Sequence, residues 1–103
     1  MKKYNIHINP EAYDDLSDIA EDIYLASKSI PIAKKYVKGI LSTINDLSKF
    51  GGSLALCQNK SITDVYGKFV RKENYKKVSI IYAVDDDDIY ILKIQFAYSI
   101  TGL

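Results

Sequence analysis

The segment VSIIYAVDDDDIYILKIQFAY, residues 78–98, decides the fold because it encodes two consecutive strands. Within residues 78–84 every second residue is large and apolar, which is the period of a strand with one buried face. Residues 89–98 are apolar on both alternating sets in their first half, as expected for a strand placed centrally or covered on both faces. Four aspartates, residues 85–88, separate the strands by the length of a hairpin connection. The segment therefore predicts a strand hairpin.

Two amphipathic helices are predicted upstream, over residues 11–26 and 31–50. In each, apolar residues recur at spacings of three and four and form a single stripe. The first helix is expected to begin with Asn9 as a side-chain cap and Pro10 at the first helical position, and the second with Ser29 as its cap. Only a few residues join the helices, so we expect an antiparallel helical hairpin.

Two features of the helices concern packing. Gly39 lies inside the second helix, where glycine costs about 1 kcal/mol relative to alanine, and we expect it to let the two helices approach closely. Tyr24, Tyr36 and Tyr82 occupy positions on apolar stripes, so we expect them to have structural roles.

Shorter signals complete the order of elements. Residues 4–9 alternate in polarity and predict a first strand, and residues 65–71 predict another after a loop over residues 51–63. The order is strand, helix, helix and then three strands, which indicates an α+β domain. We expect the hairpin to pack on one face of an antiparallel sheet of about four strands, with the first strand beside the last. The length of 103 residues fits a single domain, residues 1–103.

Composition narrows the classes of function. The 14 basic and 13 acidic residues leave a net charge of +1, so no global field attracts nucleic acid. No segment reaches the ~18 consecutive apolar residues of a membrane span, and the single cysteine, Cys57, allows no internal disulfide. We therefore expect a cytoplasmic protein without a membrane partner. His7 is the only histidine and residues 85–88 match no calcium-loop pattern, so neither a metal nor another cofactor is predicted.

Several local strings, in this order and spacing, resemble those of one protein family. They are IHINPEA at residues 6–12, DLSDI at 15–19, AKKYV at 33–37, SIIYAVDD at 79–86 and IYILKI at 89–94. The chain resembles the RelE/ParE superfamily of toxins from bacterial type II toxin–antitoxin systems, also called plasmid stabilization system proteins. The resemblance implies a growth inhibitor, neutralised by a cognate antitoxin that wraps an extended or helical segment around it. RelE-like members cut messenger RNA on the ribosome, and ParE-like members poison DNA gyrase.

The resemblance also indicates where the catalytic residues of RNA-cleaving members would fall. RelE-like enzymes use Lys, Arg and Tyr side chains from the exposed face of the sheet and from the C-terminal segment. Here Ser79 stands where RelE carries a strand arginine, and residues 97–100 contain no Lys or Arg. Tyr98 does match a terminal tyrosine of some relatives, and Tyr98 and Arg71 are the candidate catalytic residues. The chain also lacks the His-x-Arg type segment with which ParE-like members commonly end their last strand.

A basic cluster around the second predicted strand is a candidate binding site for nucleic acid or another target. Lys68, Arg71 and Lys76 lie among aromatic residues, and such a mixture can bind phosphates and stack bases. The alternative, which we favour, is a solvated strand pair whose lysines keep the sheet edge from aggregating.

Three hypotheses for the function remain open. The first is a ParE-like toxin that acts by binding and is held in check by an antitoxin. The second is a ribosome-dependent endoribonuclease, and the third is a degenerate member that binds an antitoxin without being toxic. The missing basic residues favour the first and third. Ile30 and Ile32 near the helical bend predict an apolar surface that an antitoxin covers, or through which two copies form a homodimer.

Overall fold

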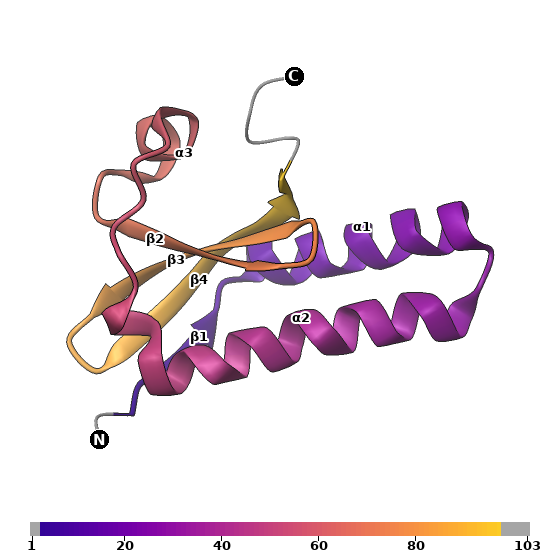
Figure 1. Cartoon of the computed structure of the whole chain (residues 1–103), viewed down its shortest axis with the longest axis horizontal. Coiled ribbons are helices and arrows are strands. Elements are labelled where there is room, and N and C mark those ends of the chain that lie inside the picture. Colours follow the sequence, from indigo (N-terminus) through magenta and orange to yellow (C-terminus); the bar gives the residue numbers. More distant parts are fainter. Residues whose placement is uncertain (1–2, 98–103) are drawn as a thin grey trace.

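A four-stranded sheet carries a helical hairpin on one face in the computed structural model, which describes residues 3–97 (Figure 1). The predicted α+β class, with two long helices between the first strand and the other three, is confirmed. None of the helices within these residues has the length and apolar content needed to cross a membrane. The elements in chain order are β1 (Asn5–Ile8), α1 (Pro10–Ser27), α2 (Ile30–Phe50), η1 (Gly51–Ser53), α3 (Lys60–Tyr66), β2 (Val70–Tyr75), β3 (Val78–Asp85) and β4 (Asp88–Phe96).

The strands are ordered β1–β4–β3–β2, so the first strand lies beside the last as predicted. The pairs β2–β3 and β3–β4 are antiparallel, whereas β1 runs parallel to β4, with Asn5 opposite Asp88. The sheet is therefore mixed and not wholly antiparallel as expected. Two hairpin turns give β4 the direction of β2. The helical hairpin returns the chain to where β1 began, and there the N–H of Tyr4 donates to the carbonyl of Ser48 over 2.7 Å.

The main core lies between the helical hairpin and one face of the sheet. Ile40 and Leu47 of α2 pack with Tyr82 of β3 and Ile91 of β4, and all four are fully buried. The Tyr82 hydroxyl donates a 2.7 Å hydrogen bond to the carbonyl of Gly51, which gives the polar end of this buried ring a partner. Burial also raises the pKa of Tyr82. The structural role predicted for Tyr82 is confirmed.

Gly39 of α2 makes room for a strand residue and not, as predicted, for the other helix. A Cβ at this position would overlap Cζ of Tyr75, at the end of β2. The Tyr75 ring also meets the Tyr36 ring edge-on, with the ring centres 5.4 Å apart. The missing side chain therefore lets the end of β2 pack directly on α2.

The two predicted helix caps have different outcomes. Ser29 caps α2, because its Oγ accepts a hydrogen bond from the N–H of Ile32 over 3.3 Å. The side chain of Asn9 makes no capping hydrogen bond, so that prediction was wrong. The Asn9 N–H instead donates to the carbonyl of Ile91 over 3.1 Å, and its carbonyl accepts from the N–H of Ala12 over 2.9 Å. Asn9 thus joins β1 to α1 through its main chain.

The region between α2 and β3 differs most from the prediction. The strand expected over residues 65–71 is instead β2, which begins at Val70. The loop expected over residues 51–63 contains η1 and the first part of α3, and α3 ends inside the predicted strand. Ile62 of α3 is buried against Val70 and Ile81. Ile81 alternates with the core-facing Tyr82, so this smaller cluster lies on the sheet face opposite the helical hairpin. The burial of Ile62 on that face holds α3 against the sheet.

Candidate interaction site

An apolar groove lies between α1 and α2 toward the bend of the hairpin. In this part of the molecule the two helices project past the sheet (Figure 1). Its volume is about 450 Å³. Three of its large side chains are well exposed, namely Tyr24 at 42%, Ile30 at 57% and Leu41 at 40%. Exposed apolar residues gathered in a groove are typical of an interaction site. Both helices contribute to the lining, which is apolar apart from two lysines: Ala20, Tyr24, Ile30, Ala33, Lys34, Val37, Lys38 and Leu41.

The groove exists because the hairpin carries more apolar positions than the sheet covers. Ile40 of α2 faces the core and is fully buried, whereas Leu41 next to it lines the groove. Ile30 and Ile32 are exposed near the bend, as expected from the sequence. Tyr24 is exposed as well, so the structural role predicted for it was wrong, because this part of α1 lies beyond the strands.

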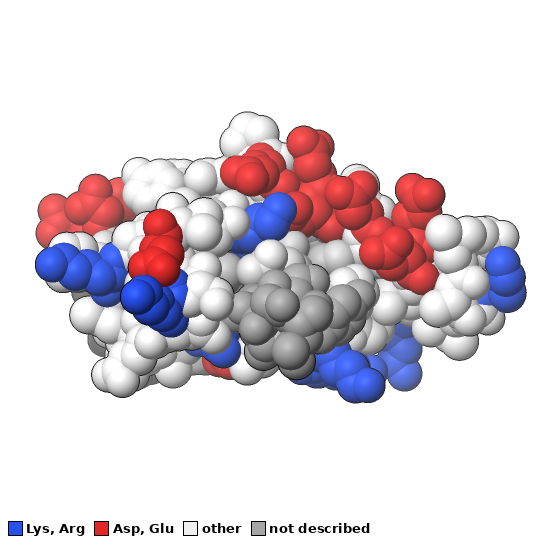
Figure 2. All heavy atoms as spheres, turned by 90° about the horizontal axis from the view of Figure 1, so that it is seen from above, with Lys and Arg blue, Asp and Glu red and all other residues white. Residues whose placement is uncertain are grey.

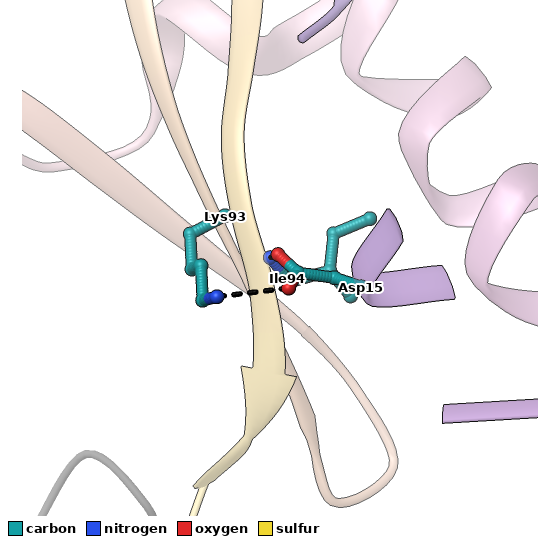
Figure 3. Close-up of polar contacts among 3 residues, drawn as sticks. All are labelled: Asp15, Lys93 and Ile94. Atoms are coloured by element: carbon teal, nitrogen blue, oxygen red, sulfur yellow. Dashed lines mark hydrogen bonds and ion pairs between the residues drawn. The ribbon is translucent and has the colours of Figure 1, made fainter. Parts of the chain in front are cut away.

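Asp15 fixes α1 against the edge of β4 (Figure 3). One carboxylate oxygen accepts a 3.0 Å hydrogen bond from the backbone N–H of Ile94, and the other accepts one of 2.8 Å from the Lys93 ammonium. The last residue of β1, Ile8, pairs with Ile91, so this edge of β4 extends past the end of its neighbouring strand. The hydrogen bond to Asp15 raises the pKa of Lys93. The contact therefore holds the helix that forms one side of the groove.

The exposed surface of α1 is strongly acidic. The helix contains acidic residues and no basic one, and red side chains line the upper right of the molecule in Figure 2, over α1. Except for Asp15, these acidic side chains are exposed. α2, on the other side of the groove, carries Lys34, Lys35 and Lys38 within two turns. The two helices of the hairpin thus differ in charge. The acidic residues of α1 are Glu11, Asp14, Asp15, Asp18, Glu21 and Asp22.

The three predicted binding residues lie along β2 and do not converge on one point. Lys68 precedes the strand, with its ammonium 5.7 Å from the centre of the Phe69 ring, and Lys76 follows it in the turn to β3. The Lys76 ammonium lies 5.5 Å from the ring centres of both Tyr36 and Tyr75. Arg71 is in the middle, and its Nε donates a 2.8 Å hydrogen bond to the carbonyl of Leu54. Arg71 thereby ties the segment after η1 to the edge of the sheet.

Two further positions bear on the predicted chemistry. Ser79, which stands where RelE carries an arginine, is fully buried, and its hydroxyl donates a 2.8 Å hydrogen bond to Oδ1 of Asn74. Its position is therefore structural. Tyr98, the other candidate catalytic residue, lies outside the described residues. A catalytic role for Tyr98 and Arg71 stays a prediction.

The sequence matches one family model over most of its length. The model, described as the ParE toxin of the type II toxin–antitoxin system parDE, aligns with residues 6–95. The chain belongs to the ParE toxin family. The matched region includes both helices of the groove and the contact between Asp15 and Lys93. The predicted membership of the RelE/ParE superfamily is confirmed. A comparison with curated proteins found no match to the sequence.

Solved structures of toxin–antitoxin systems share the fold of this ParE-family chain. It is similar to a chain of the chromosomal ParDE system from P. aeruginosa, with a TM-score of 0.74 and 20% identity over 91% of this chain and 96% of that one. It also resembles a chain of the RelBE2 complex from Mycobacterium tuberculosis (TM-score 0.55, 15% identity, 91% and 98% covered). It is also similar to a chain of the YoeB–YefM complex from Staphylococcus aureus, with a TM-score of 0.56 and 17% identity over 91% of this chain and 97% of that one. At these identities the likeness establishes the fold alone.

The lone histidine of this ParE-family chain has a structural position at the start of the sheet. His7 Nε2 lies 2.8 Å from Oδ1 of Asp88, and its ring stacks on Tyr90 with the centres 4.9 Å apart. The hydrogen bond from His7 lowers the pKa of Asp88. Within residues 3–97 no group of three His, Cys, Asp or Glu side chains is arranged to hold a metal ion.

Sequence reasoning missed the contact between Asp15 and Lys93. The helix dipole alone favours acidic residues early in a helix, so Asp15 at that position does not by itself indicate a distant partner. The contact joins residues 78 positions apart, and no local pattern encodes such a pairing. An available signal was the position of Asp15 next to Leu16 and one helical turn from Ala12 and Ile19, where a charge needs a partner if it is buried.

Proposed function

We propose that this ParE-family toxin acts by binding its target without cutting RNA, and that a cognate antitoxin neutralises it. The observation that carries the first part is that two cations of the sheet, one on β4 and one on β2, already have partners. The Lys93 ammonium is held by Asp15, and the Nε of Arg71 donates to the carbonyl of Leu54. RNA cleavage needs free cations to stabilise the charge that develops at the scissile phosphate. Ser79, buried where RelE has an arginine, supports the same conclusion.

The groove between α1 and α2 supports the proposal of an antitoxin. It exposes Tyr24, Ile30 and Leu41 to solvent, and a folded partner segment would remove this apolar surface from water. The similar structures from M. tuberculosis and S. aureus are described as complexes, the former explicitly of toxin and antitoxin. We therefore place the antitoxin on the helical hairpin. A homodimer through the same surface is the competing occupant.

For the target we propose DNA gyrase, which ParE-like toxins poison, and for the location the cytoplasm. Membership of the ParE family supports both choices. The ribosome and messenger RNA are the competing target, and they would require a cationic site other than the one that RelE-like enzymes use.

Growth and enzyme assays test the proposal together. We expect expression of the chain to arrest growth and co-expression of the product of the adjacent reading frame to restore it. The purified chain should inhibit supercoiling by gyrase and leave messenger RNA intact on translating ribosomes. Site-specific cleavage that is lost in Tyr98→Phe or Arg71→Ala would show an endoribonuclease instead. Antitoxin binding without growth arrest would show a degenerate, non-toxic member.

A further inference from the structure

Two lysines interrupt the apolar lining of the groove. Lys34 and Lys38 are one helical turn apart on α2, and they are the only charged residues among the lining side chains in the described part of the chain. Neither has an ion-pair partner within residues 3–97, in contrast to Lys93, which is bound by Asp15. Their ammonium groups therefore lie unpaired along one side of an apolar surface.

We infer that Lys34 and Lys38 select a partner helix that carries two acidic side chains beside its apolar stripe. This inference rests on the proposed antitoxin and names the chemistry of its docking segment. The groove runs between two helices whose backbone groups are bonded internally, so an extended segment lying in it would leave unpaired those of its N–H and C=O groups that face the helices. A helical segment has these groups satisfied and presents only side chains.

The length of the groove and the separation of its two lysines define the length of the partner helix and the spacing of its acidic residues. From Ile30 to Leu41 the α2 side of the groove extends over eleven residue steps, roughly 16 Å at about 1.5 Å per residue. An apolar stripe of three turns matches that length. Lys34 and Lys38 are four residues apart, about 6 Å along the axis, so acidic residues spaced by four on the partner place one carboxylate at each ammonium.

Charge also sets which side of the partner helix faces which helix of the hairpin. Covering Lys34 and Lys38 with an apolar surface would strip water from two cations, and carboxylates offset that cost. α1, on the other side, has acidic residues and no basic ones, and Glu21 directly follows the groove residue Ala20. The same acidic row placed against α1 would be repelled. The partner helix therefore binds with its acidic flank toward α2.

Charge reversal tests the inference on the intact chain with the co-purified product of the adjacent reading frame. The variant Lys34→Glu/Lys38→Glu should bind it at least about tenfold more weakly than the unchanged chain, and added salt should weaken the remaining binding less. The matched control is Lys35→Glu/Lys49→Glu, which reverses two exposed lysines of α2 outside the groove and should stay within about twofold. Circular dichroism melting curves verify that both variants fold.

Further variants separate this inference from the proposed function. Ile30→Ser/Leu41→Ser removes apolar surface from the groove and should abolish binding whether or not the lysines matter. If that variant fails to bind while Lys34→Glu/Lys38→Glu binds normally, the antitoxin docks in the groove but the lysines do not select it. If the unchanged chain binds no product of the adjacent frame, the proposed antitoxin itself is refuted. Restored binding after converting the partner's two acidic residues to lysine would establish the pairing.

Discussion

Replacing Asp15 by alanine should be among the most destabilising single changes in α1. The substitution removes the acceptor for the N–H of Ile94, a residue only 1% exposed, so water cannot readily take its place. An unpaired buried N–H costs about 1–3 kcal/mol. The ion pair with Lys93 is lost too. It contributes about 0.5–1 kcal/mol, since the side chains of Asp15 and Lys93 are 11% and 24% exposed.

The expected loss is therefore roughly 1.5–4 kcal/mol of the free energy of unfolding. This is a large part of the ~5–15 kcal/mol that stabilises a typical domain. Urea denaturation followed by circular dichroism measures the loss, provided that the slope with denaturant is unchanged. Asp15→Asn is the matched control, because its amide oxygen can still accept from Ile94 while the charge is absent. It should cost about 1 kcal/mol.

We expect the hydrogen bond from Asp15 to the strand to contribute more stability than the ion pair with Lys93. A loss below about 0.5 kcal/mol for Asp15→Ala, or equal losses for Asp15→Ala and Asp15→Asn, would refute it. A double-mutant cycle of Asp15→Ala with Lys93→Met isolates the ion pair, and we expect a coupling energy of about 0.5–1 kcal/mol.

Four further predictions concern Gly39, Tyr82 and Asp88. Gly39→Ala should destabilise the protein by about 1–3 kcal/mol although alanine favours helices, because its Cβ would collide with Tyr75, and Tyr75→Ala should relieve the loss in thermal melts. Tyr82→Phe should cost about 0.5–1.5 kcal/mol in denaturant titrations, because the carbonyl of Gly51 loses its partner; no loss would mean that the hydrogen bond contributes nothing. Because burial raises the pKa of Tyr82 above its ordinary value of 10.0, the stabilising contribution of the neutral ring is complete below pH ~10 and declines above it. Stability measured against pH should therefore fall above pH ~10 in the unchanged chain and less in Tyr82→Phe. Because the pKa of Asp88 is lowered, its contribution to stability is present above the ordinary pKa of 3.8 and is lost as the pH falls below that value. Asp88→Asn should therefore reduce the loss of stability at acid pH. An identical loss in the variant and the unchanged chain would contradict the role of His7.

The sequence was most informative where one local pattern dominates. The helical hairpin and the β3–β4 pair have apolar residues at clear periods, and each was predicted within a few residues of its bounds. β2 was misplaced because its residues, VRKENY, are mostly polar, as an edge strand allows, and show no apolar period. α3 has only seven residues and depends on burying Ile62 against Val70 and Ile81, which a local pattern does not reveal.

The candidate site was predictable only in part. Ile30 and Ile32 pointed to an uncovered surface near the bend, but the groove needs Tyr24 and Leu41 from two helices at once. The basic cluster looked continuous in the sequence because Lys68, Arg71 and Lys76 are close neighbours in the chain. Over the five residue steps of β2 an extended strand places its two ends about 17 Å apart, at roughly 3.3 Å per residue, so Lys68 and Lys76 are separated in space.

The parallel pairing of β1 with β4 also determines when the molecule can be completed during synthesis. Asn5 pairs with Asp88, so the partners are 83 positions apart in the chain, and such long-range contacts form slowly. The contacts between the two helices of the hairpin join residues much closer in the chain, so the hairpin can form earlier, once residue 50 has left the ribosome. The sheet cannot close around β1 until residue 91 has emerged. A nascent chain thus presents the two helices, with their core faces uncovered, well before any finished toxin exists.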